Sequence, residues 1–549
     1  MIVTADTETT KNPDGSMRVW LCDVCLLEKN YKHLTWLDLD GFFEWAFKQE
    51  TSVISYWHNL KFDGSYLINW LHYAGYTFSE EALLPNTYNF LVTDRAVWFM
   101  GSATNAEGKT VYFRDSHKKI PLPVKKIAKA YDLPIVKGEI DYNAPRPLGY
   151  TPDENELSYV RNDTEIVARA LVRHFEQGMD KLTAPADAIE ELKRTCDFES
   201  KFVTRWWASH SSAEAFCRKA YAGGISWVNP VIKDKVVKHG LVYDYNSMYP
   251  SVMLAYPFPT GYPVRWYSEP PKGYKLWIGR AKVNISRNPN KPACIRNPID
   301  RVWIEDEYEG ELWLTSIDAE LLQECYLGEC EIIDGYAWKG EKGVFDDFIN
   351  HWAEIKRTTK DAGLRQIAKL MLNAAYGKFG TNPRRAHKRP VWDKGFLQWQ
   401  NCPPDEGKVF NVAVAAFVTA YARRELVRCI VASTGFCYCD TDSVHLASYD
   451  GKTAKFVGRE HPTDFCAWKF ENRFVRAKYL RQKTYIEEKP DGKLLIAACG
   501  CPDSSKNYIT FDNFQMGASF KGKLRPTQRK GGCELVESRF TIRAPFDRF

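Results

Sequence analysis

The segment "FCYCDTDSVHL" at 436–446 places two aspartates, Asp440 and Asp442, between two apolar stretches that read as buried strands. Unpaired buried carboxylates are costly, so they need protons, basic side chains or metal ions as partners. A third aspartate, Asp244, ends another apolar strand, "LVYD". Asp244 and Asp442, with the carbonyl of Tyr245 and substrate phosphates, form an oxygen ligand set that suits two Mg²⁺ ions in nucleotidyl transfer. The competing interpretation of "DTD" is a turn whose carboxylates accept from backbone amides.

A second set of acids is spread over the N-terminal third of the chain. Two of them stand two residues apart on a predicted strand, and another stands four residues after a tyrosine on a predicted helix, so each pair shares a face. The members are Asp6, Glu8, Asp63 and Asp163, with Tyr159 as the tyrosine. Such a set suits a two-metal hydrolytic site, in which Tyr159 orients the attacking water. A lone acidic pair is more often solvated surface, but this ordered series resembles the tyrosine-containing DEDD 3′–5′ proofreading exonucleases, which have an RNase H-like fold.

A stripe of basic residues precedes the "DTD" segment. Its members and their continuation, spaced to share one helix face, are Arg357, Arg365, Lys369, Asn373 and Tyr376. A cationic stripe that ends in a tyrosine suits a nucleoside triphosphate, with the base stacked near the tyrosine. A solvated helix face is the ordinary interpretation of such a stripe. Here the apolar residues between these positions predict that the opposite face is buried.

The elements that must position these groups follow from hydrophobic patterning. Alternating strand and helix patterns extend to about residue 185 and predict an α/β domain. Residues 256–345 are rich in Pro, Gly and Trp, which predicts an inserted, mostly irregular subdomain with short strands. Residues 346–380 read as a helical hairpin and 382–410 as a loop or β-hairpin; a helix over 411–433 then leads into the "DTD" segment.

Composition sets the broad class of the protein. The chain has 549 residues, 44% of them hydrophobic, which predicts two or more globular domains. Basic residues outnumber acidic ones by 75 to 69, a mild bias that leaves the local basic runs, such as "KGKLRPTQRK", as the stronger indication of a polyanionic partner. The 15 cysteines lack regular spacing, and we read the lone pair Cys22 and Cys25 as ordinary strand cysteines and the set as free thiols of a reducing compartment. The longest apolar run, 410–422, is too short to span a bilayer.

The ordered motifs resemble those of family B DNA polymerases. "DYNSMYP", "KLMLNAAYGKFG", "YCDTDS" and "KTYI" follow the exonuclease series in that order, and "YAGG" lies between the two halves. The small size and the two insertions, at about 256–344 and 382–410, are similar to those of the protein-primed polymerases of small tailed phages. The resemblance covers nearly the whole chain, although Arg357 and Arg365 stand where lysine is common in the family.

The resemblance implies roles for further residues. Asp440 supports the metals held by Asp244 and Asp442, Tyr249 lies under the sugar and excludes a 2′-hydroxyl, and Tyr376 packs on the nascent base pair. Lys137 matches a catalytic lysine of the exonuclease, and "YAGG" couples synthesis to editing. The residues implied to contact DNA are Asn59, Phe62, Ser116, Tyr221, Gly223, Gly224, Lys483 and Tyr485.

We therefore predict a DNA-directed DNA polymerase with a 3′–5′ exonuclease, in a mixed α/β and α+β multidomain fold. The expected parts are an exonuclease domain (1–185), a palm in two pieces (186–255 and 411–486), a first insertion (256–344), fingers (345–381), a second insertion (382–410), and a thumb with C-terminal region (487–549). Each active site should use two Mg²⁺ ions, for which Mn²⁺ can substitute.

The expected partners are template and primer DNA, deoxynucleotides and a terminal protein that primes viral, strand-displacing replication. We expect a monomer without membrane association in the cytoplasm of a bacterial host. Two alternatives remain at this point: an RNA-primed polymerase of the same family, and a non-catalytic DNA-binding protein built on a polymerase fold.

Overall fold

The computed structural model describes residues 1–28, 30–81, 83–142, 144–451 and 453–543. Its N-terminal part is a mixed sheet in the order β17-β16-β6-β7-β8-β4-β1-β2-β3, with β5 paired to β6. The strands from this part of the chain are β1 (Ile2–Lys11), β2 (Met17–Leu26), β3 (His33–Trp36), β4 (Val53–Trp57), β5 (Thr77–Phe78), β6 (Thr87–Thr93), β7 (Trp98–Thr104) and β8 (Thr110–Asp115). The parallel pairing of β1 with β4 and of β4 with β8 forms its centre.

Helices cover this sheet and carry two of the predicted acids. They are α1 (Leu39–Phe47), α2 (Asp63–Tyr73), η1 (Ser116–Lys118), α3 (Val124–Ala130) and the long α4 (Glu154–Glu176). A capping box between Asp153 and Glu156 starts α4, because each side chain accepts a hydrogen bond from the backbone of the other. The α/β organisation predicted for this region is confirmed.

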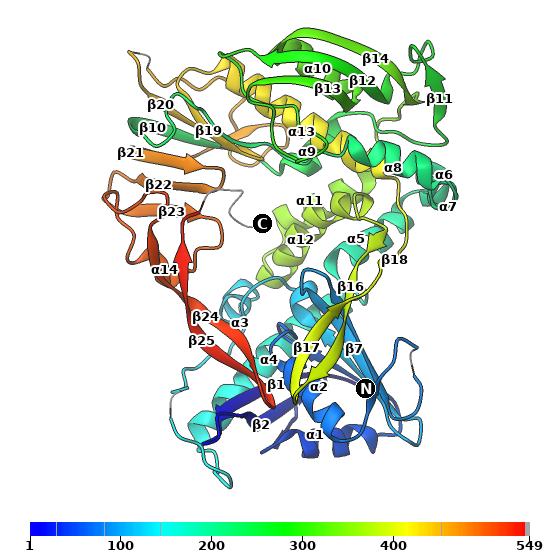
Figure 1. The fold of residues 1–549 in the computed structure, drawn as a ribbon, viewed down its shortest axis with the longest axis vertical. Helices are drawn as coiled ribbons and strands as arrows, with labels where there is room; N and C mark the ends of the chain where they lie inside the picture. Colours follow the sequence, from blue (N-terminus) through cyan, green and yellow to red (C-terminus); the bar gives the residue numbers. More distant parts are fainter. Residues whose placement is uncertain (29, 82, 143, 452, 544–549) are drawn as a thin grey trace.

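The second insertion joins the same sheet. The predicted β-hairpin is present as β16 (His387–Asp393) and β17 (Phe396–Asn401), flanked by the short pair β15 (Arg384–Arg385) and β18 (Asp405–Glu406). β16 pairs antiparallel with the end of β6, so the hairpin extends the N-terminal sheet across a sequence gap of almost three hundred residues. Figure 1 shows this hairpin running down onto the N-terminal domain.

A second large sheet has seven strands, in the order β23-β22-β21-β10-β20-β19-β9, and carries Asp244 and Asp440 near strand ends. Its strands are β9 (Ser226–Val228), β10 (Val236–Tyr245), β19 (Phe436–Asp440), β20 (Ser443–Ser448), β21 (Trp468–Arg481), β22 (Thr484–Glu488) and β23 (Leu494–Ala498). The predicted strands on both sides of "DTD" are β19 and β20. The sheet continues through β22 and β23, past the palm boundary at residue 486 that the sequence indicated.

The first insertion is more regular than predicted. It forms a four-stranded antiparallel sheet, β11-β14-β12-β13, instead of a mostly irregular subdomain. Its elements are β11 (Val264–Tyr267), β12 (Leu276–Arg287), β13 (Glu307–Thr315), α10 (Ser316–Cys325) and β14 (Tyr326–Trp338). The prediction was wrong because the Pro residues gather in the connections. β12 is a long strand whose second half alternates buried and more exposed residues, and β14 pairs with it along its whole length.

Of the remaining helices, the two of the helical hairpin lie between the N-terminal domain and the upper part of the molecule (Figure 1). The predicted helical hairpin is α11 (Asp346–Thr358) and α12 (Ala362–Phe379), and the predicted helix before "DTD" is α13 (Val412–Ala432). α13 is buried around most of its circumference, so its apolar length reflects a core position. The others are α5 (Ala184–Thr195), α6 (Phe198–Phe202), α7 (Thr204–Ser209), α8 (Ser211–Lys219), α9 (Met248–Ala255) and α14 (Asp503–Lys506).

The last described segment is a long hairpin that returns to the N-terminal domain. It consists of β24 (Ser519–Arg529) and β25 (Gly532–Thr541). At its tip the Tyr66 hydroxyl donates to the Cys533 carbonyl at 2.5 Å, and Lys11 forms an ion pair with Glu534 at 2.8 Å. Cys533 and Leu397, from the two hairpins, are both buried in the hydrophobic core of the N-terminal domain.

The cysteines and the apolar helices bear on two predictions drawn from composition. All 15 cysteines are free thiols, and Cys22 and Cys25 are buried in β2 as ordinary strand residues. Within the described ranges, none of the helices combines the length and apolar character needed to cross a lipid bilayer.

Candidate active sites

The four N-terminal acids converge on one cavity of about 440 Å³, which we call the N-terminal site. β1 contributes Asp6 and Glu8, and the first residue of α2 is Asp63. Asp163 comes from α4, one turn after Tyr159. The set predicted from sequence is therefore brought together from three separate elements.

Electrostatics at the N-terminal site favour binding of positive charge. Burial, reinforced by neighbouring carboxylates, raises the pKa of Glu8 to about 8 and that of Asp6 well above its ordinary value. Burial also raises the pKa of Asp63 to about 7, even though Thr7 donates to its Oδ1 through both hydroxyl, at 2.6 Å, and backbone N–H. Close carboxylates cannot all ionise without a compensating cation.

Two side chains beside the acids fix their geometry. The Lys137 ammonium forms an ion pair with Oδ2 of Asp163, and although burial opposes its charge, this carboxylate raises the pKa of Lys137. Oδ1 of Asp163 is buried and has no hydrogen-bond partner among the residues that the structure describes. The Tyr159 hydroxyl lies 2.6 Å from the Tyr142 hydroxyl in a pair that sequence reasoning missed, because Tyr142 precedes α4 in an irregular segment.

The predicted single-strand contacts at this site fall into two groups. Asn59 and Phe62 line the N-terminal cavity. Ser116 does not, because its side chain is 0% exposed and its hydroxyl donates to the Trp57 carbonyl at 3.2 Å and lies 2.9 Å from Nδ1 of His58. A direct DNA contact by the Ser116 side chain does not fit this geometry, which suits positioning of the His58 loop instead.

The central site gathers Asp244, Asp440 and Asp442 at neighbouring strand ends. Asp244 stands next to Ser443 in the β10–β20 register, and the Tyr245 N–H donates to the Asp442 carbonyl at 2.6 Å. Burial, with the Asp244 charge, raises the pKa of Asp442 to about 7, and burial also raises the pKa of Asp244. These are oxygen donors that carry excess negative charge, as a Mg²⁺ site requires.

Asp440 has a different environment from the other two acids. Both of its oxygens accept from Lys483, at 2.5 and 2.7 Å. Lys483 is therefore paired with Asp440, and its backbone adopts a left-handed φ of 53°. Tyr485, two residues later, packs against the rings of Tyr438 and Tyr479.

The "YAGG" segment lies directly on this turn. A Cβ on Gly224 would be 3.0 Å from Thr441, between the two aspartates, and 3.2 Å from the Tyr249 hydroxyl. Gly223 adopts a φ of 84°, and its carbonyl accepts from the Arg423 guanidinium. The Tyr221 ring lies against Gly380, at the end of α12.

Two tyrosines form one wall of the central site. The rings of Tyr249 and Tyr376 lie 4.0 Å apart between centroids, from α9 and α12. Lys369 and Asn373 lie exposed on α12, as does Arg365, whose guanidinium donates to the Thr359 carbonyl at 2.7 Å.

Arg357 does not continue this face. It forms an ion pair with Glu354 at 2.7 Å, with its side chain 73% exposed. α11 ends before α12 begins, so counting residues along one helix across that turn misassigned the face. Another lysine, Lys356, lies close to Lys369: burial and the charges of Lys369 and Lys469 lower the pKa of Lys356. Lys469 in turn interacts electrostatically with Asp244. Neither Lys356 nor Lys469 was predicted from the sequence.

Comparisons with known proteins place the whole chain in one family. A family model described as "DNA polymerase type B, organellar and viral" matches residues 144–455. The DNA polymerase of Bacillus phage Nf is 36% identical over 98% of this chain and 99% of its own length. That of Bacillus phage phi29 is 35% identical over 98% of each chain.

Solved structures match over the same extent. The phi29 enzyme with primer-template DNA has a TM-score of 0.88 and 32% identity, and covers 99% of this chain and 100% of its own. The same enzyme in a ternary complex with primer-template DNA and incoming nucleotides matches equally well.

Proposed function

Since the chain belongs to the type B DNA polymerases of organelles and viruses, we propose that its two carboxylate sites divide the polymerase and exonuclease activities between them. It is a phi29-like phage DNA polymerase with an associated exonuclease. The central site would add deoxynucleotides, and the N-terminal site would remove mispaired 3′ ends. The single observation that supports this division is that each site gathers buried carboxylates with raised pKa values, in separate sheets.

Catalysis in this family depends on divalent metal ions, and the donors of both sites fit them. At the central site Asp244, Asp442 and the Tyr245 carbonyl would hold two Mg²⁺ ions, and Asp440 with Lys483 would support them. At the N-terminal site the ligands would be Asp6, Glu8, Asp63 and Asp163, whose Oδ1 is otherwise without a partner. When bound, such ions stabilise charge on the attacking and leaving oxygens, and Mn²⁺ can substitute for Mg²⁺.

In polymerisation, the positive side chains of the two helices would bind the triphosphate. Lys369 and Arg365 on α12, with Lys356 and Lys469 beside them, supply this charge. Tyr376 would pack against the nascent base pair. Tyr249, 4.0 Å from it between ring centroids, would fill the space that a 2′-hydroxyl needs.

In editing, the residues around the N-terminal acids would orient the reacting groups. Tyr159, held by Tyr142, would position the attacking water. Lys137 would keep Asp163 ionised and oriented through their ion pair. Asn59 and Phe62 would hold the 3′ end in the cavity.

The insertions support protein priming and strand displacement. The sheet of the first insertion exposes side chains of both charges, such as Lys282, Glu309 and Glu329, which suits a terminal protein as partner. The second forms a hairpin anchored on the N-terminal sheet, from which it would enclose the template and separate a downstream strand. We propose that the chain consists of the exonuclease domain, palm, fingers, thumb and two insertions at the bounds predicted from the sequence. It would act as a monomer in the host cytoplasm.

Separation of the two activities tests the proposal. Asp442→Ala should abolish nucleotide incorporation in a primer-extension assay and leave single-strand degradation largely intact, whereas Asp63→Ala should do the reverse. Asp491→Ala, an exposed aspartate in the turn after β22, is the matched control and should change neither. Loss of both activities in either folded variant would contradict the assignment.

A further inference from the structure

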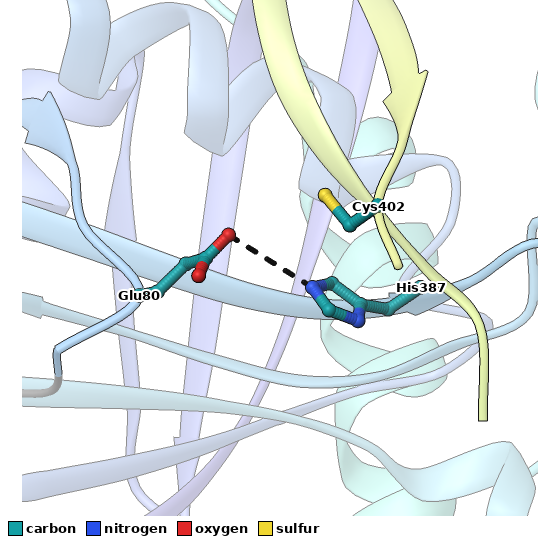
Figure 2. Close-up of side chains that lie close together, drawn as sticks. All are labelled: Glu80, His387 and Cys402. Atoms are coloured by element: carbon teal, nitrogen blue, oxygen red, sulfur yellow. Dashed lines mark ion pairs between the residues drawn. The ribbon is translucent and has the colours of Figure 1, made fainter. Parts of the chain in front are cut away.

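One group of side chains outside both active sites has the composition of a transition-metal site. Among the residues that the structure describes, Glu80, His387 and Cys402 bring a carboxylate oxygen, a ring nitrogen and a thiol sulfur within 4.8 Å of one another. Figure 2 shows the Glu80 carboxylate turned toward the imidazole of His387, with Cys402 beside His387 and Glu80 approaching from a different part of the chain. Oxygen, nitrogen and sulfur donors together are typical of Zn²⁺ sites.

The sheet itself sets this convergence. His387 begins β16 and stands opposite Thr93 at the end of β6. Cys402 directly follows β17, and its backbone N–H donates to the His387 carbonyl at 2.9 Å, so the two residues are cross-strand neighbours. Glu80 follows β5, which pairs with the start of β6. Three strand ends of one sheet therefore carry the three donors.

A second carboxylate orients the imidazole. Nε2 of His387 faces Glu80 at 3.9 Å, whereas Nδ1 lies 3.3 Å from Asp405 on its other side. Nδ1 is buried and makes no hydrogen bond of good geometry with any described residue. The second ring nitrogen of a metal-bound histidine commonly donates a hydrogen bond from its N–H to a carboxylate. This fixes the tautomer in which the first nitrogen is free to bind the ion. Asp405 stands where such a carboxylate is needed.

We propose that Glu80, His387 and Cys402 bind one Zn²⁺ ion, with water as the fourth ligand, and thereby fasten the second insertion to the N-terminal domain. The thiolate and the carboxylate balance the charge of a divalent ion. Thiolate and imidazole favour zinc over the Mg²⁺ that suits the all-oxygen sites. Donor atoms around tetrahedral zinc lie about 3.5 Å apart, so the group must contract by roughly 1 Å; Glu80, with its side chain 62% exposed, has the freedom to move.

Cobalt substitution in the full-length chain tests the site without reference to catalysis. The chain is stripped with a chelator and titrated with Co²⁺ in excess Mg²⁺, which occupies the all-oxygen sites. A near-ultraviolet thiolate-to-cobalt charge-transfer band that saturates at one equivalent, and that Zn²⁺ removes, is expected. Cys402→Ser should abolish the band, whereas Cys330→Ser, which removes an exposed thiol on β14, should retain it.

Two further variants examine the other ligands. His387→Gln should lose the band, and Asp405→Asn should weaken Co²⁺ binding about 10- to 100-fold, as is usual when the partner of a metal-bound histidine is removed. Zn²⁺ should raise the melting temperature of the wild-type chain but not that of Cys402→Ser. Absence of the band at saturating Co²⁺ in the wild-type chain, or an undiminished band in Cys402→Ser, would overturn the proposal.

Discussion

Replacing Gly224 by alanine should slow nucleotide incorporation while leaving the exonuclease reaction intact. The new Cβ would lie 3.0 Å from Cγ2 and 3.1 Å from Oγ1 of Thr441, and 3.2 Å from the Tyr249 hydroxyl. Thr441 cannot move alone: it stands between Asp440 and Asp442 at a left-handed φ of 61°, and its N–H donates to the Ile225 carbonyl at 2.6 Å. Relief of the contact therefore shifts the turn that carries the acids.

The magnitude follows from the size of that shift. Contacts this close require the neighbour to give by a few tenths of an ångström. A misplacement of 1 Å can cost about a hundredfold in rate, so a shift of this size should lower kcat/KM for incorporation roughly fourfold to tenfold. The overpacking itself should lower the free energy of unfolding by about 1–3 kcal/mol.

The assay compares single-nucleotide incorporation with degradation of a single strand by the same protein preparation. Gly377→Ala is the matched control, because a Cβ on Gly377 meets no atom within 4 Å. It should leave both rates near those of the wild-type chain and, as an exposed helical position, gain a little stability. Incorporation that is unchanged in Gly224→Ala, or an equal decline of both activities, would refute the reasoning.

Three other predictions address sugar choice, pH and the insertions. Tyr249→Val should raise the kcat/KM for ribonucleotides relative to deoxynucleotides in steady-state incorporation, and an unchanged ratio would remove the steric role. Because Glu8 has a pKa of about 8, and Asp63 and Asp442 of about 7, the folded metal-free chain retains protons that the unfolded chain releases near pH 4. Its unfolding free energy should therefore fall as pH rises from about 4 to 8, so that Mg²⁺ raises the melting temperature more near pH 8 than near pH 5; equal shifts in thermal unfolding would contradict this. Deletion of about 384–407 should preserve short gap filling but shorten rolling-circle products, whereas replacing 256–344 by a linker should chiefly reduce nucleotide transfer to a terminal protein; the protein-primed assignment fails if both deletions keep long products and full transfer.

Local patterns in the sequence were enough to select acids that the structure brings together in one cavity. Asp6 and Glu8 share a strand face by the two-residue period, and Tyr159 and Asp163 share a helix face. Each pattern lies within one element, so it survives folding unchanged. The prediction that these elements converge came from the order of the motifs and the family resemblance, because residue spacing alone does not show that β1 and α4 lie side by side.

The features that sequence reasoning missed depend on contacts between distant elements. Lys356 on α11 lies near Lys369, and Lys469 on β21 lies near Asp244, although no periodicity in the sequence connects these elements. Ser116 is polar and follows a strand, yet its hydroxyl is buried and hydrogen-bonds with the Trp57 carbonyl and the His58 ring. The pairing of His387 with Thr93 is equally invisible locally, because an edge strand does not specify its partner.

The return of both hairpins to the N-terminal domain has a consequence for biosynthesis. The core of that domain is completed by Leu397 and Cys533, which leave the ribosome long after the first sheet has been made. At about 5–20 residues per second, the open end of β6 waits roughly 15–60 s for β16, and Tyr66 waits longer for the last hairpin. A nascent chain in this interval exposes an unpaired strand edge and apolar surface. Truncation near residue 185 should therefore yield an aggregation-prone fragment, although the acids of the N-terminal site all lie within it.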